Sequence, residues 1–134
     1  MIHVLDTNVF IAFLNGKVGV LNRLDLLTPE DVVLCAPVLA ELEYGAYCST
    51  RQGDNLARIR ALAARTRFQA FDGAVARQFG DMKAELRRIG NLKADFDLSI
   101  AATSLYLGAT LVSDDRAFHD KPIPRLAVAN WLLS

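Results

Sequence analysis

Short apolar runs alternate along this chain with longer segments in which apolar residues recur every three or four positions. Short apolar runs indicate strands of a sheet that is covered on both faces, whereas the longer period indicates amphipathic helices. The runs predict strands at residues 2–5, 32–36, 68–71, 109–112 and 126–128. The segments between them predict helices at residues 8–15, 18–27, 37–47, 54–66, 74–89 and 96–107.

The clearest helical pattern comes in the second half of the chain. Val75, Phe79, Met82 and Leu86 follow one another at three- and four-residue spacing, and Gly90 suits the end of that helix. Strands that alternate with helices predict an α/β fold built on a parallel sheet. In open sheets of this kind, ligands bind at the carboxyl ends of the strands.

Length and composition narrow the class of protein. With 134 residues, of which 52% are hydrophobic, the chain is expected to form a single domain over residues 1–134. No apolar run reaches the roughly 20 residues that a membrane span needs. Asp6 also interrupts the apolar stretch near the N-terminus, so we expect a cytoplasmic protein without a membrane segment. Cys35 and Cys48 lie among apolar residues and are expected to be buried thiols.

The charges are unevenly distributed, although the formal net charge is +0. Residues 1–50 carry a net charge of −4, residues 51–93 carry +6 and residues 94–134 carry −2. The middle segment could present a basic face to a polyanion, or its Arg and Lys side chains could simply solvate helix surfaces. The two acidic segments contain every carboxylate that the chemistry below requires.

Acidic residues stand at the ends of several predicted elements. Asp6 directly follows the first strand, Glu41 lies one turn into the helix after the second, and Asp97 lies near the start of a helix. Asp114 and Asp115 follow the strand at 109–112. One edge of a parallel sheet could therefore hold all of these carboxylates. Such a cluster implies a hard divalent cation, because unpaired buried carboxylates would repel one another.

Each acid also has an ordinary structural interpretation. Asp6 could cap the following helix, Glu41 could be an exposed helical residue, and Asp114 and Asp115 could be turn residues. A charge at the position of Asp97 could be stabilised by the helix dipole. Asp95 fits the N-cap of that helix better, which leaves the Asp97 carboxylate free. It is the joint placement of these residues that indicates a site.

The candidate chemistry is hydrolysis of a phosphodiester assisted by Mg²⁺ or Mn²⁺, since this reaction needs no nucleophilic side chain. A histidine-based triad is not expected, because the only imidazoles are His3 in a strand and His119 in a loop. The sequence also has no phosphate-binding glycine-rich loop of the common kinds. A Mg²⁺-dependent phosphatase of the aspartyl-nucleophile type would need a second Asp at position 8, where Asn8 stands.

Four segments together resemble the PIN-domain ribonucleases, in particular the VapC-type toxins of bacterial toxin–antitoxin pairs. The resemblance covers essentially the whole chain. It rests on Leu5-Asp6-Thr7-Asn8-Val9, on Glu41-Leu42-Glu43-Tyr44-Gly45, on Phe96-Asp97-Leu98-Ser99-Ile100-Ala101-Ala102, and on Leu111-Val112-Ser113-Asp114-Asp115-Arg116-Ala117-Phe118. It implies a PIN-like three-layer α/β/α fold with a central parallel sheet of about four to five strands.

The last segment departs from the usual family pattern. Ser113 replaces the usual Thr and keeps its hydroxyl group. The spacing to Phe118 is ambiguous by one residue, so Asp115 is the preferred fourth acid and Asp114 the alternate. Ala94-Asp95 stands where Gly-Pro often precedes the third acid, which affects the expected shape of that loop.

The resemblance implies a homodimeric endoribonuclease that depends on Mg²⁺ or Mn²⁺ and is neutralised by a VapB-type antitoxin lying across its active-site groove. Its catalytic and metal-binding residues would be Asp6, Glu41, Asp97 and Asp115, supported by Thr7, Asn8 and Ser113. Candidate contacts to RNA phosphates are Arg51, Lys93 and Arg116. The alternative functions are a non-catalytic PIN-like or receiver-like binding module and a Mg²⁺-dependent phosphatase.

Overall fold

A five-stranded parallel sheet forms the centre of the molecule in a computed structural model that describes residues 1–133. The strands lie in the order β3-β2-β1-β4-β5. Their bounds are β1 His3–Leu5, β2 Val32–Cys35, β3 Arg67–Gln69, β4 Thr110–Val112 and β5 Ala127–Ala129. This arrangement confirms the predicted α/β/α fold with a parallel sheet of four to five strands.

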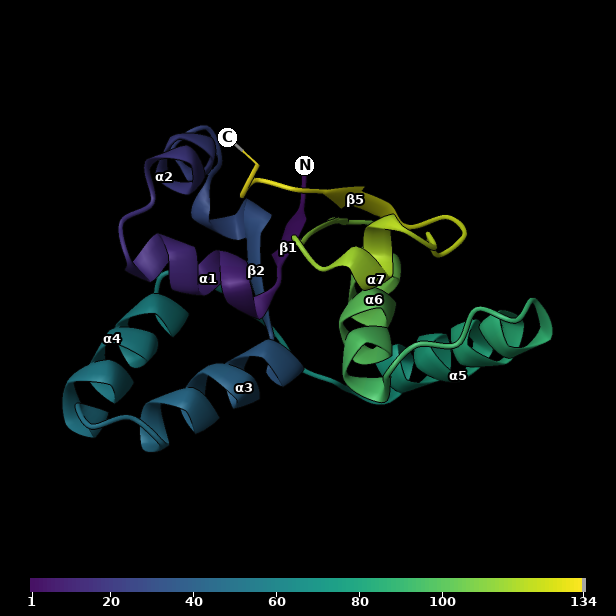
Figure 1. Cartoon of the computed structure of the whole chain (residues 1–134), viewed down its shortest axis with the longest axis horizontal. Helices are drawn as coiled ribbons and strands as arrows, with labels where there is room; N and C mark the ends of the chain where they lie inside the picture. Colours follow the sequence, from purple (N-terminus) through teal and green to yellow (C-terminus); the bar gives the residue numbers. More distant parts are fainter. Residues whose placement is uncertain (134) are drawn as a thin grey trace.

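The helices cover both faces of the sheet (Figure 1). The helices that join β1 to β2 and β2 to β3 lie together on one side: α1 Thr7–Leu14, α2 Val18–Leu24, α3 Ala36–Tyr47 and α4 Gln52–Ala63. The helices α5 Gly73–Arg88 and α6 Asp95–Leu107 lie on the other side, with the short α7 Arg116–His119 beside α6. A 3₁₀ turn, Pro29–Asp31, precedes β2.

Local sequence chemistry sets the ends of these helices. The carboxylates of Asp6 and Asp72 cap α1 and α5, because each accepts a hydrogen bond from a backbone N–H of the first turn. Pro37 occupies the first turn of α3, where its missing N–H costs nothing. Gly90 follows α5 and Gly108 ends α6, both at positive φ, which glycine adopts without strain.

The core lies on both sides of the sheet and explains why α6 lacks a clear amphipathic pattern. In α6, Leu98, Ile100 and Ala101 are completely buried, and Ala102, Thr103 and Ser104 are buried with them. A helix that is buried on several faces carries apolar residues on several faces. Thr103 and Ser104 satisfy their hydroxyl groups by donating to backbone carbonyls one turn earlier.

Several local predictions need correction. Cys48 is exposed and only Cys35 is buried, because Cys48 follows the last turn of α3. Ala94, not Asp95, occupies the N-cap of α6, and the Asp95 carboxylate instead accepts a 2.8 Å hydrogen bond from Lys83. His119 ends α7 rather than lying in a loop.

The boundaries of most helices and strands also differ from the predicted ones by a few residues. The second helix, for example, stops at Leu24 instead of continuing to residue 27. Such shifts are expected because helix ends fray and propensity alone does not fix them. Within residues 1–133, every helix is too short or too polar to span a bilayer.

Candidate active site

The order of the strands defines where a ligand should bind. From β1 the chain moves outwards to β2 and β3, then crosses to the opposite side of β1 to form β4 and β5. The crevice between β1 and β4 is therefore the point at which the direction of winding reverses, and ligands in open α/β sheets bind there. Asp6 follows β1 at this point, and Asp114 and Asp115 follow β4.

Asp6 is buried at this edge, with 8% of its surface exposed. One carboxylate oxygen, Oδ1, accepts a 2.7 Å hydrogen bond from the backbone N–H of Thr7, and Oδ2 accepts a 2.7 Å hydrogen bond from Ser113 Oγ. Burial raises the pKa of Asp6 above its usual range, and the charges of Asp115 and Glu41 raise it further. The two hydrogen bonds lower the pKa but do not cancel the effect of burial.

Ser113 connects three parts of the site. Besides donating to Asp6, its Oγ accepts a 3.0 Å hydrogen bond from the backbone N–H of Asp115. Its backbone carbonyl lies 2.8 Å from Nε2 of His119. Because a carbonyl oxygen can only accept, Nε2 must carry the ring proton in this contact. No role for His119 was predicted from the sequence, because only the turn between β4 and α7 brings its ring to the backbone carbonyl of Ser113.

Asp114 and Asp115 have different surroundings. Asp114 Oδ1 accepts a 3.4 Å hydrogen bond from Asn8 Nδ2, which ties the loop after β4 to α1. Asp115 caps α7 by accepting a 2.9 Å hydrogen bond from the backbone N–H of Ala117. The charge of Asp115 contributes to the raised pKa of both Asp6 and Asp97. Asp115 as the fourth acid and Asp114 as the alternate therefore remain a prediction from the sequence.

Asp97 faces the same group of carboxylates from the first turn of α6. Burial raises its pKa, and the charges of Asp115, Asp6 and Glu41 add to that increase, in this order. Lys93 partly offsets them. All four predicted acids are therefore close enough to influence one another electrostatically, although they come from four separate elements of the fold.

The four carboxylates are too far apart to form a complete set of metal ligands. Among residues 1–133, no three acidic, histidine or cysteine side chains are arranged closely enough to hold a metal ion as they stand. The donor chemistry nevertheless suits a hard cation, since all four candidates are carboxylates. In addition, Thr7 Oγ1 is buried without a hydrogen-bond partner in the described part of the chain, which leaves a polar atom to be satisfied next to Asp6.

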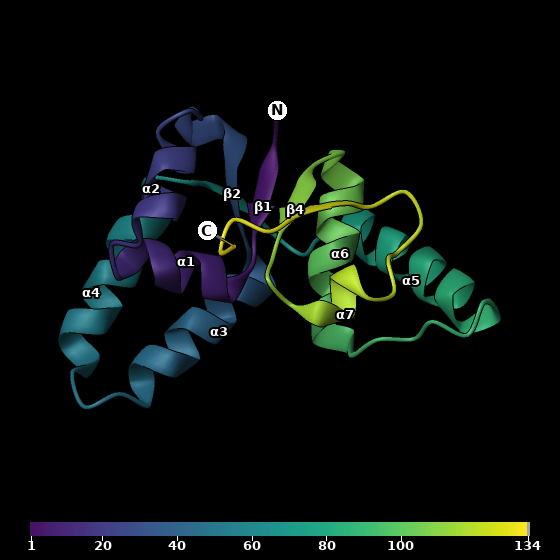
Figure 2. The ribbon, with the colours of Figure 1, turned by 45° about the horizontal axis from the view of Figure 1, so that its top comes forward.

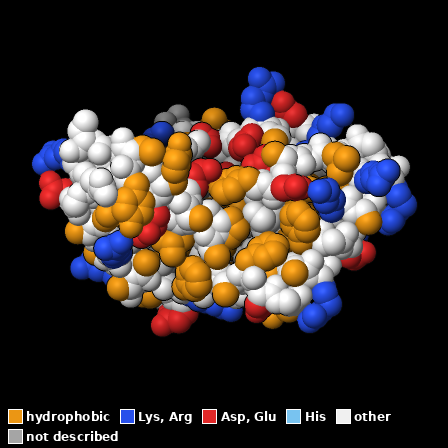
Figure 3. All heavy atoms as spheres, turned by 90° about the horizontal axis from the view of Figure 1, so that it is seen from below, with side chains coloured by type: hydrophobic (Ala, Val, Ile, Leu, Met, Phe, Trp, Pro, Cys, Tyr) orange, Lys and Arg blue, Asp and Glu red, His pale blue; other side chains and the backbone are white. Residues whose placement is uncertain are grey.

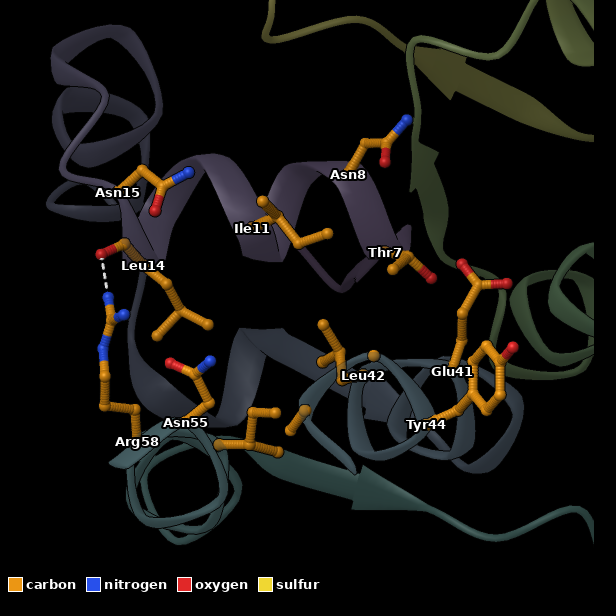
Figure 4. Close-up of a pocket in the computed structure, with 13 residues that line it drawn as sticks. Thr7, Asn8, Ile11, Leu14, Asn15, Glu41, Leu42, Tyr44, Asn55 and Arg58 are labelled. Carbon is orange, nitrogen blue, oxygen red and sulfur yellow. Dashed lines mark hydrogen bonds between the residues drawn. The ribbon is translucent and has the colours of Figure 1, made fainter. Parts of the chain in front are cut away.

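A groove leads away from the acidic centre between α1 on one side and α3 and α4 on the other. It has a volume of about 400 Å³. Figure 4 shows Thr7 and Glu41 at one end, Ile11 and Leu42 along its length, and Arg58 at the other end. Arg58 donates a hydrogen bond to the backbone carbonyl of Leu14, which closes that end.

The surface around this region is strongly apolar. Tyr44 and Tyr47 on α3 are 70% and 52% exposed. In the view from below in Figure 3, hydrophobic side chains gather over the middle of the face, acidic groups lie beside them and most Lys and Arg side chains lie towards the edges. Exposed apolar surface of this extent usually marks an interaction site.

The three basic residues that were predicted to contact RNA lie in different places. Arg51 precedes α4 and pairs with Asp54 at 3.4 Å. Lys93 lies in the loop before α6, close enough to Asp97 to lower its pKa. Arg116 begins α7 and pairs with Asp120 at 3.1 Å. Of the three, Lys93 and Arg116 line a common hollow with Asp97, whereas Arg51 lines a different one.

Comparison with known proteins agrees with this architecture. The family model described as "PIN domain" matches residues 3–124, and the chain belongs to this family. It is 31% identical to "Ribonuclease VapC2" of Rickettsia felis, with 98% of both chains covered. It is also 31% identical to "tRNA(fMet)-specific endonuclease VapC" of Shigella flexneri, with 83% of this chain and 84% of that protein covered.

A solved structure with the same fold is a crystal structure of VapBC2 from Rickettsia felis bound to a DNA fragment from its promoter. The TM-score is 0.85 and the sequences are 29% identical, with 98% of this chain and 99% of that chain covered. The expected resemblance to PIN-domain proteins and to VapC-type relatives is thereby confirmed.

Proposed function

We propose that this protein is the endoribonuclease toxin of a VapBC-type toxin–antitoxin pair and hydrolyses RNA phosphodiester bonds with the help of Mg²⁺ or Mn²⁺. The observation that carries the proposal is the position of Asp6. It is buried at the switch point of the sheet, held by Ser113, and repelled by the charges of Asp115 and Glu41. Mutually repelling carboxylates at a ligand-binding edge imply a cation.

The residues that would hold this cation are Asp6, Glu41, Asp97 and Asp115. When bound, the metal would lower the pKa of a coordinated water and neutralise charge on the attacked phosphate. Ser113 keeps one Asp6 oxygen oriented, and the backbone N–H of Thr7 holds the other. Asn8 fixes the loop that carries Asp114 and Asp115. Thr7 Oγ1, buried next to Asp6, has no hydrogen-bond partner among residues 1–133.

The decisive experiment is cleavage of total cellular RNA by the purified protein with Mn²⁺, with EDTA, and with Asp6→Asn. We expect discrete products only from the wild-type protein with Mn²⁺, and these products identify the RNA that is cut. Glu43→Gln is the matched control, because Glu43 lies on α3 near Glu41 but pairs with Arg60 at 3.6 Å. Cleavage by Asp6→Asn at the wild-type rate would contradict the proposal.

We propose further that a VapB-type antitoxin occupies the groove between α1, α3 and α4. The groove begins at Glu41, is lined by Ile11, Leu14 and Leu42, and ends at Arg58. A bound segment could bury apolar side chains along its length and place a charged end near the acidic centre or near Arg58. Occupation of the groove would also obstruct access of RNA to Glu41. Co-expression with the antitoxin should yield a complex without nuclease activity.

Homodimerisation and a cytoplasmic location are also part of the proposal, by kinship with VapC-type proteins. Light scattering on the purified protein should give twice the monomer mass of 14.7 kDa. Fractionation of cells should recover the protein with the cytoplasm. A strictly monomeric protein at micromolar concentration would contradict the first statement without affecting the assignment of the acidic site.

A further inference from the structure

A second hollow lies beside Asp97 and shares no lining residue with the apolar groove. It has a volume of about 380 Å³ and lies between the loop at residues 90–94 and the segment that contains α7. Figure 2 shows α7 beside the start of α6, where this loop arrives. Its charged lining residues are Lys93, Asp97, Arg116, Asp120 and Lys121.

Two hydrogen bonds hold the side chain of Lys93 in this lining. Its Nζ donates to the backbone carbonyl of Ala117 and, at 3.3 Å, to Oδ1 of Asn91. These contacts hold the ammonium group between the loop before α6 and the helix α7. A long, flexible side chain that is held in this way has already lost most of its rotamer freedom. It can therefore bind a ligand at a small additional entropic cost.

The ammonium group of Lys121 also acts electrostatically on Lys93. Its pKa is lowered, first by partial burial and then by the charge of Lys121, while Asp97 and Asp115 partly offset the decrease. Lys121 lines the same hollow. The two lysines are therefore close enough to repel each other. Like charges held near one another in a hollow are stabilised by an anion between them, just as the proposed cation would stabilise the carboxylates near Asp97.

The other charges of the hollow compensate one another. Arg116 and Asp120 form an ion pair at 3.1 Å. Within residues 1–133, neither Lys93 nor Lys121 forms an ion pair with a carboxylate at bonding distance. The lining of the hollow therefore carries three positive and two negative side chains, and its two lysines lie beside the carboxylates that would hold the cation without a direct ion pair to any of them.

We propose that Lys93 and Lys121 form a subsite for an RNA phosphate that neighbours the bond to be cut. This inference rests on the proposed ribonuclease function, since it places the scissile phosphate at the carboxylates. An RNA strand carries a phosphate at every nucleotide, so a strand whose scissile phosphate lies at Asp97 must place neighbouring phosphates on either side. The groove between α1, α3 and α4 is largely apolar, whereas this hollow offers two ammonium groups.

The test measures binding of a fluorescein-labelled, mixed-sequence, short single-stranded RNA by anisotropy over a range of KCl concentrations in EDTA, where no cleavage occurs. The variants are Lys121→Ala, Lys93→Met and the double variant. For single strands the slope of log K against log salt falls by about 0.7 for each phosphate contact that is lost. We expect that decrease for each single variant and about twice that decrease for the double variant.

Lys17→Ala is the control, because Lys17 is exposed, precedes α2 and donates to the carbonyl of Leu132, far from Asp97 in the fold. It should leave the slope unchanged. Lys93→Met could weaken RNA binding merely by disturbing the loop that Lys93 holds. Lys121→Ala is therefore the variant that tests the loss of a phosphate contact more directly. In cleavage assays with Mn²⁺, Lys121→Ala should raise KM and leave kcat nearly unchanged, because the contact is the same in ground and transition states.

The outcomes separate this inference from the proposed function. If the wild-type protein cleaves RNA but the double variant keeps the wild-type slope, the lysine subsite is wrong and the ribonuclease assignment stands. If the slopes fall as expected but no cleavage occurs with Mn²⁺, the phosphate subsite stands and the ribonuclease assignment fails. A wild-type protein that does not bind the RNA at all would overturn the subsite.

Discussion

Ser113 Oγ donates a 2.7 Å hydrogen bond to Oδ2 of Asp6, although the two residues are 107 positions apart in the sequence. Both residues are buried at the ends of the paired strands β4 and β1. The same Ser113 oxygen accepts the backbone N–H of Asp115. One hydroxyl group therefore orients two of the proposed metal ligands, which makes Ser113 a positioning residue for the whole acidic centre.

Ser113→Ala should weaken both the fold and the activity. Loss of a hydrogen bond to a charged group costs about 1.5–3 kcal/mol of stability, and loss of such a supporting partner costs roughly 10–100-fold in metal affinity or activity. Ser113→Thr keeps the hydroxyl and should retain most of both properties. Urea unfolding and Mn²⁺ titration of the two variants check this. Equal Mn²⁺ affinity in Ser113→Ala and wild-type protein would remove the positioning role.

Ionisation of Asp6 and Asp97 should destabilise the metal-free protein as the pH rises through the acidic range. The pKa values of Asp6 and Asp97 are raised in the folded state, so the folded state binds more protons than the unfolded state between the two sets of pKa values. Their ionisation therefore destabilises the fold progressively from about pH 4, the unfolded value for Asp, up to the raised folded values. Above these raised pKa values, both carboxylates are ionised and the full destabilisation of the folded state applies.

Asp97→Asn isolates this effect in urea unfolding experiments in EDTA. The variant should be more stable than the wild-type protein at pH 7.5, and the difference should shrink towards pH 4. Saturating Mn²⁺ should stabilise the wild-type protein and not the variant, because the cation compensates the same repulsion. A variant that is less stable than wild type at every pH would show that Asp97 supports the fold rather than a charge cluster.

The position of much of the candidate site could be predicted because it depends only on where the strands of the parallel sheet end. Apolar runs placed strands before Asp6 and before Asp114, and parallel strands bring their carboxyl ends to one edge. The choice between Asp114 and Asp115 could not be made from spacing alone. It depends on the direction in which the turn after β4 points each side chain. Asn8 donates to the carboxylate of Asp114, whereas the carboxylate of Asp115 caps α7.

Features that arise from packing between distant segments were not predictable. Lys121 has no periodic or motif context, and only the approach of its segment to the loop before α6 brings it near Lys93. The prediction that Asp95 is the N-cap of α6 was wrong for a similar reason, since Lys83 on α5 donates a hydrogen bond to the Asp95 carboxylate. Propensity describes a residue and its sequence neighbours, whereas these contacts depend on the tertiary fold.

The two cysteines should differ strongly in reactivity. Burial raises the pKa of the Cys35 thiol to about 12, and the charge of Asp6 contributes to the increase. Cys48 is exposed. Because the thiolate is the reactive form, a disulfide reagent at pH 8 should titrate one thiol in the native protein and two in denaturant. Cys48→Ser should leave none in the native state, and rapid labelling of Cys35 would contradict the described burial.

Tyr44 provides a test of the groove that leaves the chemistry untouched. It lines the groove one turn beyond Glu41, and 70% of its surface is exposed. Exposed aromatic residues beside an apolar groove are frequent centres of binding energy, and truncating such a residue costs about 2 kcal/mol or more. Tyr44→Ala should therefore weaken antitoxin binding by roughly 30-fold in a titration of the purified toxin with its antitoxin.

Tyr106→Ala is the matched control, because Tyr106 lies on α6, away from the groove, and is 46% exposed. It should bind the antitoxin like the wild-type protein. Tyr44→Ala should still cleave RNA with Mn²⁺, since Tyr44 donates no ligand to the acidic centre. It should also require more antitoxin for inhibition, because inhibition and binding share the same groove. Equal inhibition of Tyr44→Ala and Tyr106→Ala would place the antitoxin elsewhere on the surface.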